Sequence, residues 1–311
     1  MIEEAFNISG NVTVSKEDPK VDTLLFLFGL PTAVLNCISI LVLLKSKKLK
    51  FSIRLPALQM AISDMCLGVI SCIPSTIFDS LDICITKRYF IVAFYVFGCL
   101  TITIMNTDRF ISLRFPFQYV KICTHVNITA ACLLSWIIAM PLPILENFCH
   151  MQTLLTDRDS FQWSPFVIFG IVSINLGEYC YVIKCVTKNT TKKFQASLGN
   201  RRCIIKISLF TGCFVLFTFP MFVANMVNAI KDESDEGLLQ RLRILFSVMA
   251  MINPILNPFL YCFLFTECRF QVIGIFCFWN KTLSERNKTN RNIFFCSYMQ
   301  QSGPPRLTTN M

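Results

Sequence analysis

Charged residues are scarce in this chain. They make up 15% of its 311 residues, whereas an ordinary soluble domain carries roughly a quarter. Apolar residues reach 54%, and phenylalanine alone occurs 30 times. This balance excludes a typical soluble domain and indicates a membrane protein.

Histidine is rarer still, with only His125 and His150 in the whole chain. No HExxH or helical HxxxD pattern occurs that would bind zinc, and no glycine-rich loop occurs that would hold a phosphate. Without such motifs, we expect neither an enzyme nor a catalytic cofactor.

Residues 1–22 lack the apolar core of a signal peptide, so the first apolar stretch is expected to direct membrane insertion.

Long apolar stretches occur seven times. Each has about 20 residues, the length of a helix that crosses roughly 30 Å of hydrocarbon. Only Asp64 and Glu178 carry charge within them. The stretches are apolar on every face and do not alternate, so barrel strands are not expected. The sequence predicts an all-α membrane protein with seven transmembrane helices, at residues 24–44, 55–78, 89–107, 126–145, 163–183, 207–230 and 244–265.

The basic residues predict the orientation. With the N-terminus outside, the cytoplasmic segments hold 21 of the 29 lysines and arginines and only 3 of the 19 acids. The positive-inside rule therefore predicts an extracellular N-terminus, in a multi-pass protein of the plasma membrane. The net charge of +10 comes from this inner face. It suits anionic membrane lipids and an acidic cytoplasmic partner, and no nucleic acid.

Sequons and cysteines are consistent with this topology. Asn7 and Asn11 begin glycosylation sequons in the predicted outer tail. Of 16 cysteines, only Cys84 and Cys149 fall in outer segments, where the environment is oxidising. A disulfide between them would join the outer end of the third helix to the loop after the fourth. Two unpaired thiols are the alternative.

The chain is expected to form one domain, the seven helices within residues 23–265, after an extracellular tail at 1–22. Residues 266–279 are apolar after a polar start, which predicts an amphipathic helix on the inner membrane surface. Cys277 in this segment is a palmitoylation candidate, and a buried structural thiol is the alternative. Residues 280–311 are polar and are expected to be a disordered cytoplasmic tail.

Short motifs follow one another in a characteristic order. The third helix ends in Asp108-Arg109-Phe110, with Cys84 25 residues before Arg109, and the seventh helix contains NPFLY, ending at Tyr261. In this order and spacing the chain resembles the rhodopsin-like (class A) G-protein-coupled receptors over nearly its whole length. Further matching residues are Asn36, Asp64, Pro116, Trp136 and Pro220.

This resemblance implies a two-state switch. A ligand bound between the outer halves of the helices would stabilise a conformer whose inner face opens to a heterotrimeric G protein. Arg109 would then leave Asp108 and meet the Gα subunit, while Tyr261 fills the space and Phe117 enters a socket of the same partner. Proline kinks would let the sixth and seventh helices move. The implied coupling and switch residues are Asp108, Arg109, Phe117, Pro220, Asn257, Pro258 and Tyr261.

Asp64 lies inside the predicted second helix, where a carboxylate costs about 2.5 to 3.5 kcal/mol on insertion scales. Asn36, Asn253 and Asn257 are its expected polar partners. The resemblance implies an allosteric sodium ion at rest, held by Asp64, Asn253 and Asn257. However, Gly98 stands where the family usually supplies a hydroxyl ligand to that ion.

Several residues depart from the family pattern. Thr218 replaces the aromatic residue before the proline of the sixth helix. Asn200 replaces an acid that locks Arg109 at rest in many relatives, so we expect raised basal signalling. Cys268 replaces the phenylalanine at the start of the last short helix, a role that Phe270 could take instead.

The ligand is less well specified. Ile91 stands where amine receptors place an acid, so a biogenic amine is not expected. The family pocket projected onto this chain is largely apolar and suits a small organic molecule. Lys87 and Arg88 could hold an anionic group, or could pair with nearby acids. The candidate ligand-binding residues are Lys87, Arg88, Ile91, Val92, Tyr95, Met221, Phe222, Asn225, Ser247 and Met251.

Alternatives remain open at two levels. The short loops and the NPILNPFLY motif are similar to odorant-type chemoreceptors, but their proline-methionine-tyrosine signature is absent, so a non-olfactory orphan receptor for a small molecule is the competitor. From another class, a seven-helix ion channel or transporter would use Asp64 and Glu178. It predicts internal symmetry between the halves, which the sequence lacks. Glu178 could also pair with a polar inner-face group or snorkel at the boundary.

Overall fold

The computed structural model describes residues 19–73, 81–145, 164–188, 211–217, 219–220, 223, 236–276 and 279–302. These residues form helices, turns and short connections, and no strand occurs among them. The predicted all-α fold is therefore confirmed. The helices are α2 (Pro19–Lys45), α3 (Phe51–Ser71), α4 (Leu81–Arg114), α5 (Pro116–Ile122), α6 (His125–Ala139), α8 (Ser164–Lys188), α10 (Glu236–Leu264), α11 (Thr266–Phe276) and α12 (Lys281–Ser302).

The membrane spans follow the predicted apolar stretches. In the described ranges, five helical stretches are long and apolar enough to span a membrane, or six if the bent pair of Met251–Leu264 and Thr266–Phe276 is counted. Most of the predicted sixth span, 207–230, lies outside the described residues, although 211–217, 219, 220 and 223 are helical. Helices α4 and α10 are longer than predicted because each continues past its apolar stretch into polar sequence.

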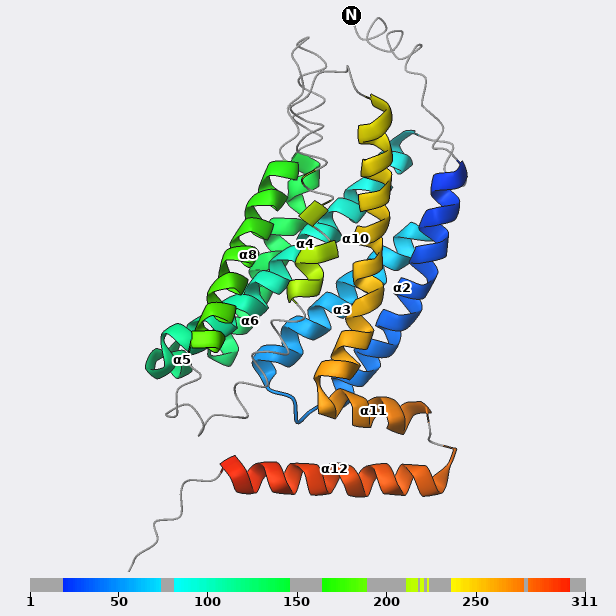
Figure 1. The fold of residues 1–311 in the computed structure, drawn as a ribbon. Coiled ribbons are helices and arrows are strands. Elements are labelled where there is room, and N and C mark those ends of the chain that lie inside the picture. Colours follow the sequence, from blue (N-terminus) through cyan, green and yellow to red (C-terminus); the bar gives the residue numbers. More distant parts are fainter. Residues whose placement is uncertain are drawn as a thin grey trace, which may run out of the picture.

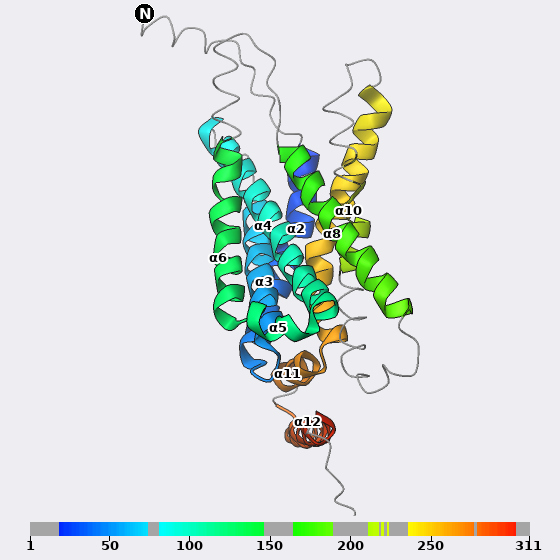
Figure 2. The ribbon, with the colours of Figure 1, turned by 90° about the vertical axis from the view of Figure 1, so that its left-hand side faces the viewer.

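Helix α4 crosses the middle of the bundle. It packs against α3, α6 and α8, while α2 packs against α3 and α10, and the two views in Figures 1 and 2 show the helices gathered around it. Aromatic contacts join α4 to α6: the ring centre of Phe97 lies 3.9 Å from that of Trp136, and Phe94 meets the same indole edge-on at 6.3 Å. The bundle therefore positions the side chains of α4 from several sides.

Small residues bring α2 and α3 close together. A Cβ atom added to Gly68 would lie 2.5 Å from the backbone nitrogen of Ala33, and one added to Gly29 would lie 2.9 Å from the carbonyl oxygen of Gly68. Such a distance leaves no room for a side chain at either glycine. Close backbone approach at small residues is a common way to pack helices inside a membrane, where the hydrophobic effect does not drive helices together.

Local sequence explains where several helices begin and end. Helix α3 ends at Ser71, shortly before Pro74, because the residue before a proline is disfavoured in helical geometry. Pro116 is the first residue of α5, a position that needs no backbone N–H donor. The Thr124 side chain caps α6 by accepting a hydrogen bond from the Asn127 backbone.

The outward faces of the helices carry large apolar side chains. Leu27 on α2 and Leu133 and Ile137 on α6 are all more than half exposed. Many such residues on one helix face would be unfavourable in water. They suit contact with lipid hydrocarbon.

Helices α11 and α12 lie at the end of the bundle that is predicted to face the cytoplasm. Helix α11 is bent by 103° from the end of α10, and α12 runs below α11 in both views (Figures 1 and 2). The expectation of a disordered tail is wrong for residues 281–302, which form α12. Specific contacts explain the difference: Arg291 pairs with the buried carboxylate of Glu267, and the Asn287 amide donates to the carbonyl oxygen of Phe270 at 2.8 Å. Composition alone does not reveal such contacts.

Candidate functional site

The C-terminal end of α4 carries an adjacent acid and base, and both are buried. Asp108 is 5% exposed and Arg109 is 4% exposed. Nη2 of Arg109 lies 3.4 Å from Oδ2 of Asp108, while Nε of Arg109 has no hydrogen-bond partner among the described residues. Burying a charge is costly unless hydrogen bonds satisfy it. Arg109 therefore retains donor capacity for a further acceptor.

Tyr119 on α5 gives Asp108 a second partner. Its hydroxyl donates a 2.9 Å hydrogen bond to Oδ1 of Asp108. Burial raises the pKa of Tyr119 to about 12, and the neighbouring Asp108 carboxylate adds to this shift. The phenol therefore stays protonated and able to donate at neutral pH. The sequence analysis did not single out Tyr119, although it lies just 11 residues after Asp108.

Phe117 lies on the same short helix as Tyr119, but its side chain points into the surroundings and not toward Asp108. Its side chain is 96% exposed, although a large aromatic ring is usually more than half covered in a folded protein. Val120, also on α5, is 78% exposed. Helix α5 thus presents an apolar surface beside the buried pair of Asp108 and Arg109. The predicted role of Phe117 in partner binding stays a prediction.

A chain of buried polar side chains joins three helical segments near this pair. The Thr211 hydroxyl donates to Oδ1 of Asn106, and the Asn106 amide donates to Oδ1 of Asn175 at 2.7 Å. The Asn175 amide in turn donates to the Thr103 hydroxyl at 2.8 Å. We call these four residues the polar ladder. It connects α4 with α8 and with the helical segment 211–217.

The polar ladder was missed by the sequence analysis, which weighed only charged residues and family motifs. Asn106 and Asn175 lie in apolar spans, where polar side chains are uncommon and usually face other helices. That placement was the available signal. A similar bridge was also missed: the Gln59 amide donates to Thr101 at 3.1 Å and to Ser135 at 2.6 Å, which links α3, α4 and α6.

Glu178 pairs with a polar side chain of α4. Its Oε1 accepts a 2.9 Å hydrogen bond from the Thr107 hydroxyl, and its Oε2 is buried without a hydrogen-bond partner among the described residues. Of the two interpretations that the sequence left open, the structure favours a polar partner on a neighbouring helix.

Asp64 is buried and paired with the seventh predicted helix. Its Oδ2 accepts a 2.7 Å hydrogen bond from the Asn257 amide. Asn36 had been expected to be a polar partner of Asp64, but its amide instead donates to the carbonyl oxygens of Thr32 and Pro254. The Tyr261 hydroxyl donates to the carbonyl oxygen of Ala57 at 3.3 Å. In this conformation Tyr261 therefore packs on α3.

The residues around Asp64 fit a sodium ion only in part. The side-chain oxygens of Asn36 and Asn253 are buried and accept no hydrogen bond from any described residue, so they are available as ligands to a hard cation. Gly98 contributes none, and a Cβ atom there would meet nothing within 4 Å. The hydroxyl ligand that the resemblance implies at this position is therefore missing, and open space takes its place.

The proposed ligand-binding residues are described only in part. Ile91, Val92 and Tyr95 are half-buried on α4, and Lys87 is buried near its outer end. Met251 lines a cavity of about 20 Å³ whose other walls come from α2, α3 and Pro254, with no residue of α4. The positions or side chains of the remaining candidates lie outside the described residues, namely Arg88, Met221, Phe222, Asn225 and Ser247.

The other predicted features have mixed outcomes. Cys268, not Phe270, is buried at the junction of α10 and α11, where it accepts a hydrogen bond from Ser46, whereas Phe270 packs against Phe294 of α12. Pro220 is half-buried in a helical stretch, and Pro258 is buried in α10. Outside the described residues or side chains lie Asn7, Asn11, Cys84, Cys149, Asn200, Thr218 and Cys277.

Comparison with known families agrees with this geometry. The family model described as "7 transmembrane receptor (rhodopsin family)" matches residues 35–261. The matched range includes the Asp108–Arg109 pair, Asp64 and Asn257, and it ends at Tyr261.

Individual relatives are distant. An olfactory receptor 2A7 of Mus musculus is 23% identical over 203 residues, covering 57% of this chain and 63% of its own length. An allatostatin-A receptor of Bombyx mori is 22% identical and covers 76% of this chain and 73% of its own. A proteinase-activated receptor 1 of Cricetulus longicaudatus is 24% identical, over 83% of this chain and 66% of its own. The chain thus spans slightly less than two thirds of two of these three relatives.

Proposed function

Because this chain belongs to the rhodopsin family of seven-transmembrane receptors, we propose that it binds a small extracellular ligand among the outer helix halves and activates a heterotrimeric G protein from its inner face. Members of this family are signalling receptors and not enzymes, and the chain is a multi-pass membrane protein. We place the N-terminus outside and the protein in the plasma membrane, because the predicted inner segments hold most of the basic residues.

One observation carries the proposal: a buried arginine at the inner end of α4 is held by an acid that a neighbouring helix also binds. Arg109 faces Asp108 at 3.4 Å, and Tyr119 of α5 donates to the same carboxylate. In this arrangement the Arg109 side chain can bind either of two partners, the neighbouring Asp108 carboxylate or an acceptor group supplied by another protein. A G protein that offers backbone or side-chain acceptors would replace Asp108 as its partner.

The polar ladder supports a resting conformation. An outward movement of the segment 211–217 would break the hydrogen bond between Thr211 and Asn106. Asn200 provides no carboxylate at the usual locking position, so this hydrogen bond takes over part of the restraint. A neutral hydrogen bond is weaker than an ion pair to a buried arginine. Raised basal signalling is therefore part of the proposal.

The ligand class is proposed only broadly, as a small organic molecule. The relatives differ in what their names say they respond to: one is olfactory, one is a receptor for allatostatin-A, and one is activated by proteinases. Two further olfactory receptors of Homo sapiens match at 24% and 22% identity. This recurrence supports a chemosensory role over a non-olfactory one.

A channel or transporter is not favoured. Asp64 is bound to Asn257, and Glu178 is bound to Thr107 on a different pair of helices. Two carboxylates that are each engaged by a neighbouring helix do not form a shared ion path.

Three covalent modifications remain proposals from the sequence. They are a disulfide between Cys84 and Cys149, glycosylation at Asn7 and Asn11, and palmitoylation at Cys277.

The proposal is tested by nucleotide exchange on a panel of purified Gα proteins, in membranes with or without this chain. Phe117→Ala should lower nucleotide exchange that depends on this chain about tenfold. The bound G protein would bury the Phe117 ring, and an aromatic side chain buried at the centre of an interface typically contributes 2 kcal/mol or more. Ile137→Ala is the matched control, since Ile137 is also exposed but faces outward from α6. If no Gα protein responds at matched surface expression, with or without a library of volatile and lipid-like ligands, coupling is refuted.

A further inference from the structure

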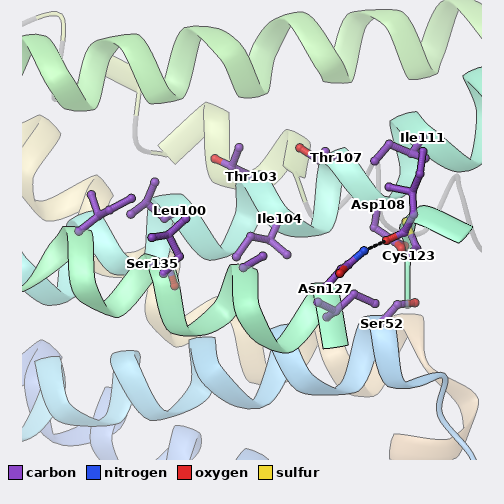
Figure 3. Close-up of a pocket in the computed structure, with 15 residues that line it drawn as sticks. Ser52, Leu100, Thr103, Ile104, Thr107, Asp108, Ile111, Cys123, Asn127 and Ser135 are labelled. Carbon is purple, nitrogen blue, oxygen red and sulfur yellow. Dashed lines mark hydrogen bonds between the residues drawn. The ribbon is translucent and has the colours of Figure 1, made fainter. Parts of the chain in front are cut away.

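A cavity of about 340 Å³ lies between α4 and α6, in the inner half of the bundle. Figure 3 shows side chains of α4 such as Thr103 and Ile104 on one side and Ser135 and Asn127 of α6 on the other. Its volume lies within the range of pockets that hold small molecules. We call it the α4–α6 pocket. It is separate from the outer half of α4, where the extracellular ligand is proposed to bind.

The α4–α6 pocket is long and runs along the helices. Its α4 wall extends from Leu100 to Ile111 and its α6 wall from Asn127 to Ile138. Eleven steps of helix correspond to about 16 Å at 1.5 Å per residue. One leaflet of the bilayer has a hydrocarbon thickness of about 15 Å, half of the usual 30 Å. The pocket therefore has the length of one leaflet.

The pocket borders the lipid-facing surface. Leu134 and Ile138 line it and are 53% and 43% exposed. Next to them, Leu133 and Ile137 are also exposed and face away from the bundle. In a membrane, hydrocarbon and not water lies against this surface. An occupant would therefore enter from the bilayer.

The inner end of the pocket is polar and adjoins basic residues. Ser52, Asp108, Cys123 and Asn127 gather at this end in Figure 3. The bases Lys50, Arg54 and Lys121 lie within two residues of Ser52 or Cys123 in the sequence, in cytoplasmic segments whose sole acid is Asp108. The carboxylate of Asp108 is already bound by Tyr119 and Arg109. The excess charge at this end is therefore positive, which suits an anionic headgroup.

From this length, exposure and charge, we propose that the α4–α6 pocket binds one hydrocarbon chain of an anionic phospholipid of the inner leaflet. The chain lies between α4 and α6, and the headgroup lies at the inner end beside Lys121 and Asn127. Lipids that merely surround the protein have no such preference for one groove or one headgroup.

This site also has a consequence for signalling, which rests on the proposed function. Asp108 lines the pocket and holds Arg109. A lipid that binds this conformation better than the open one shifts the population toward rest. Anionic phospholipid should then lower basal exchange, and blocking the pocket should raise it. The binding itself is measured without any G protein, so failure of the coupling proposal leaves this test intact.

The test is photocrosslinking in nanodiscs of phosphatidylcholine that contain a trace of phosphatidylserine with a diazirine on one acyl chain. Mass spectrometry should find crosslinks concentrated on the stretches 100–111 and 127–138. Ala131→Phe fills the pocket, since Ala131 lines it, and should lower these crosslinks about tenfold. Ala130→Phe is the matched control, because its neighbour Ala130 is exposed outside the pocket, and it should leave them unchanged.

A second pair guards against a folding defect in Ala131→Phe. Leu134→Trp changes a lining residue, and Leu133→Trp changes its exposed neighbour, so crosslinks should fall only in the first. Lys121→Gln should reduce crosslinking by phosphatidylserine but not by a phosphatidylcholine probe. Crosslinks spread evenly over all lipid-facing helices, equal labelling in each matched pair, or no preference for the anionic probe would overturn the proposal.

Discussion

The hydroxyl of Tyr119 lies 2.9 Å from Oδ1 of Asp108 and thereby ties α5 to the inner end of α4. The other oxygen of the same carboxylate faces Arg109. One side chain thus connects the apolar surface of α5 to the buried arginine. Any partner that moves α5 changes the hold of Asp108 on Arg109.

Tyr119→Phe should raise basal nucleotide exchange. The change removes a single hydroxyl, and a hydrogen bond to a charged group contributes about 1.5 to 3 kcal/mol, which corresponds to a shift of roughly 10- to 150-fold between the two states. Gln118→Ala, at an exposed neighbouring position, is the control and should behave like wild type. Unchanged exchange in Tyr119→Phe would mean that this hydrogen bond does not restrain the switch. Since the pKa of Tyr119 is raised to about 12, the restraint should not vary between pH 6 and 8.

Asn175→Leu should loosen the bundle around the polar ladder. It removes the hydrogen bonds with Asn106 and Thr103, and such interactions within membranes contribute about 0.6 kcal/mol each on average. The unfolding temperature in detergent should fall by a few degrees, and basal exchange should rise. Ser173→Val changes an exposed residue of the same helix and should do neither. An unfolding temperature equal to that of wild type would show that the ladder carries little of the stability.

Gly68→Ala should destabilise the protein despite the small size of the change. The new methyl group would lie 2.5 Å from the backbone nitrogen of Ala33, so α2 and α3 must separate, at a cost of about 1 to 3 kcal/mol. Gly170→Ala, where a Cβ atom meets nothing within 4 Å, should be neutral or slightly stabilising, since alanine favours helices. Thermal unfolding of the two variants side by side measures the difference. Equal stability would contradict the close contact.

Arg291→Ala should release α12 from α11. Glu267 is 4% exposed and Arg291 is its ion-pair partner, so the change leaves a buried carboxylate without its counter-charge. Amide hydrogen exchange in residues 281–302 should become markedly faster. Arg286→Ala, on the same helix at an exposed position, is the control. Rapid exchange in wild type and both variants alike would show that α12 is not held by this pair.

The parts of the fold that depend on composition along the chain could be predicted, and those that depend on pairing between distant residues could not. An apolar run of about 20 residues is sufficient evidence for a span. The pairing of Glu267 with Arg291 joins residues 24 positions apart and ties a tail for which composition predicts disorder to α11. Local chemistry was therefore a poor guide to α12.

The candidate site shows the same division. The Asp108–Arg109 pair and its place at the end of an apolar run could be identified from the sequence, because both are local. The polar ladder could not, since Asn106 meets Asn175 from 69 positions away and nothing local specifies which polar groups face each other. Asn36 gives a further example: it was expected to be a polar partner of Asp64, but its amide binds backbone carbonyls instead.

The central claim is that Asp108 restrains Arg109 and that Arg109 engages the G protein. Exchange on the Gα panel with Asp108→Asn and Arg109→Ala at matched surface expression tests it most directly, because the two neighbours should have opposite effects. Asp108→Asn weakens the hold on Arg109 and should raise basal exchange about tenfold, whereas Arg109→Ala should reduce it to the level of membranes without the chain. If both variants lower exchange, or neither changes it, the account of this pair as restraint and effector is contradicted.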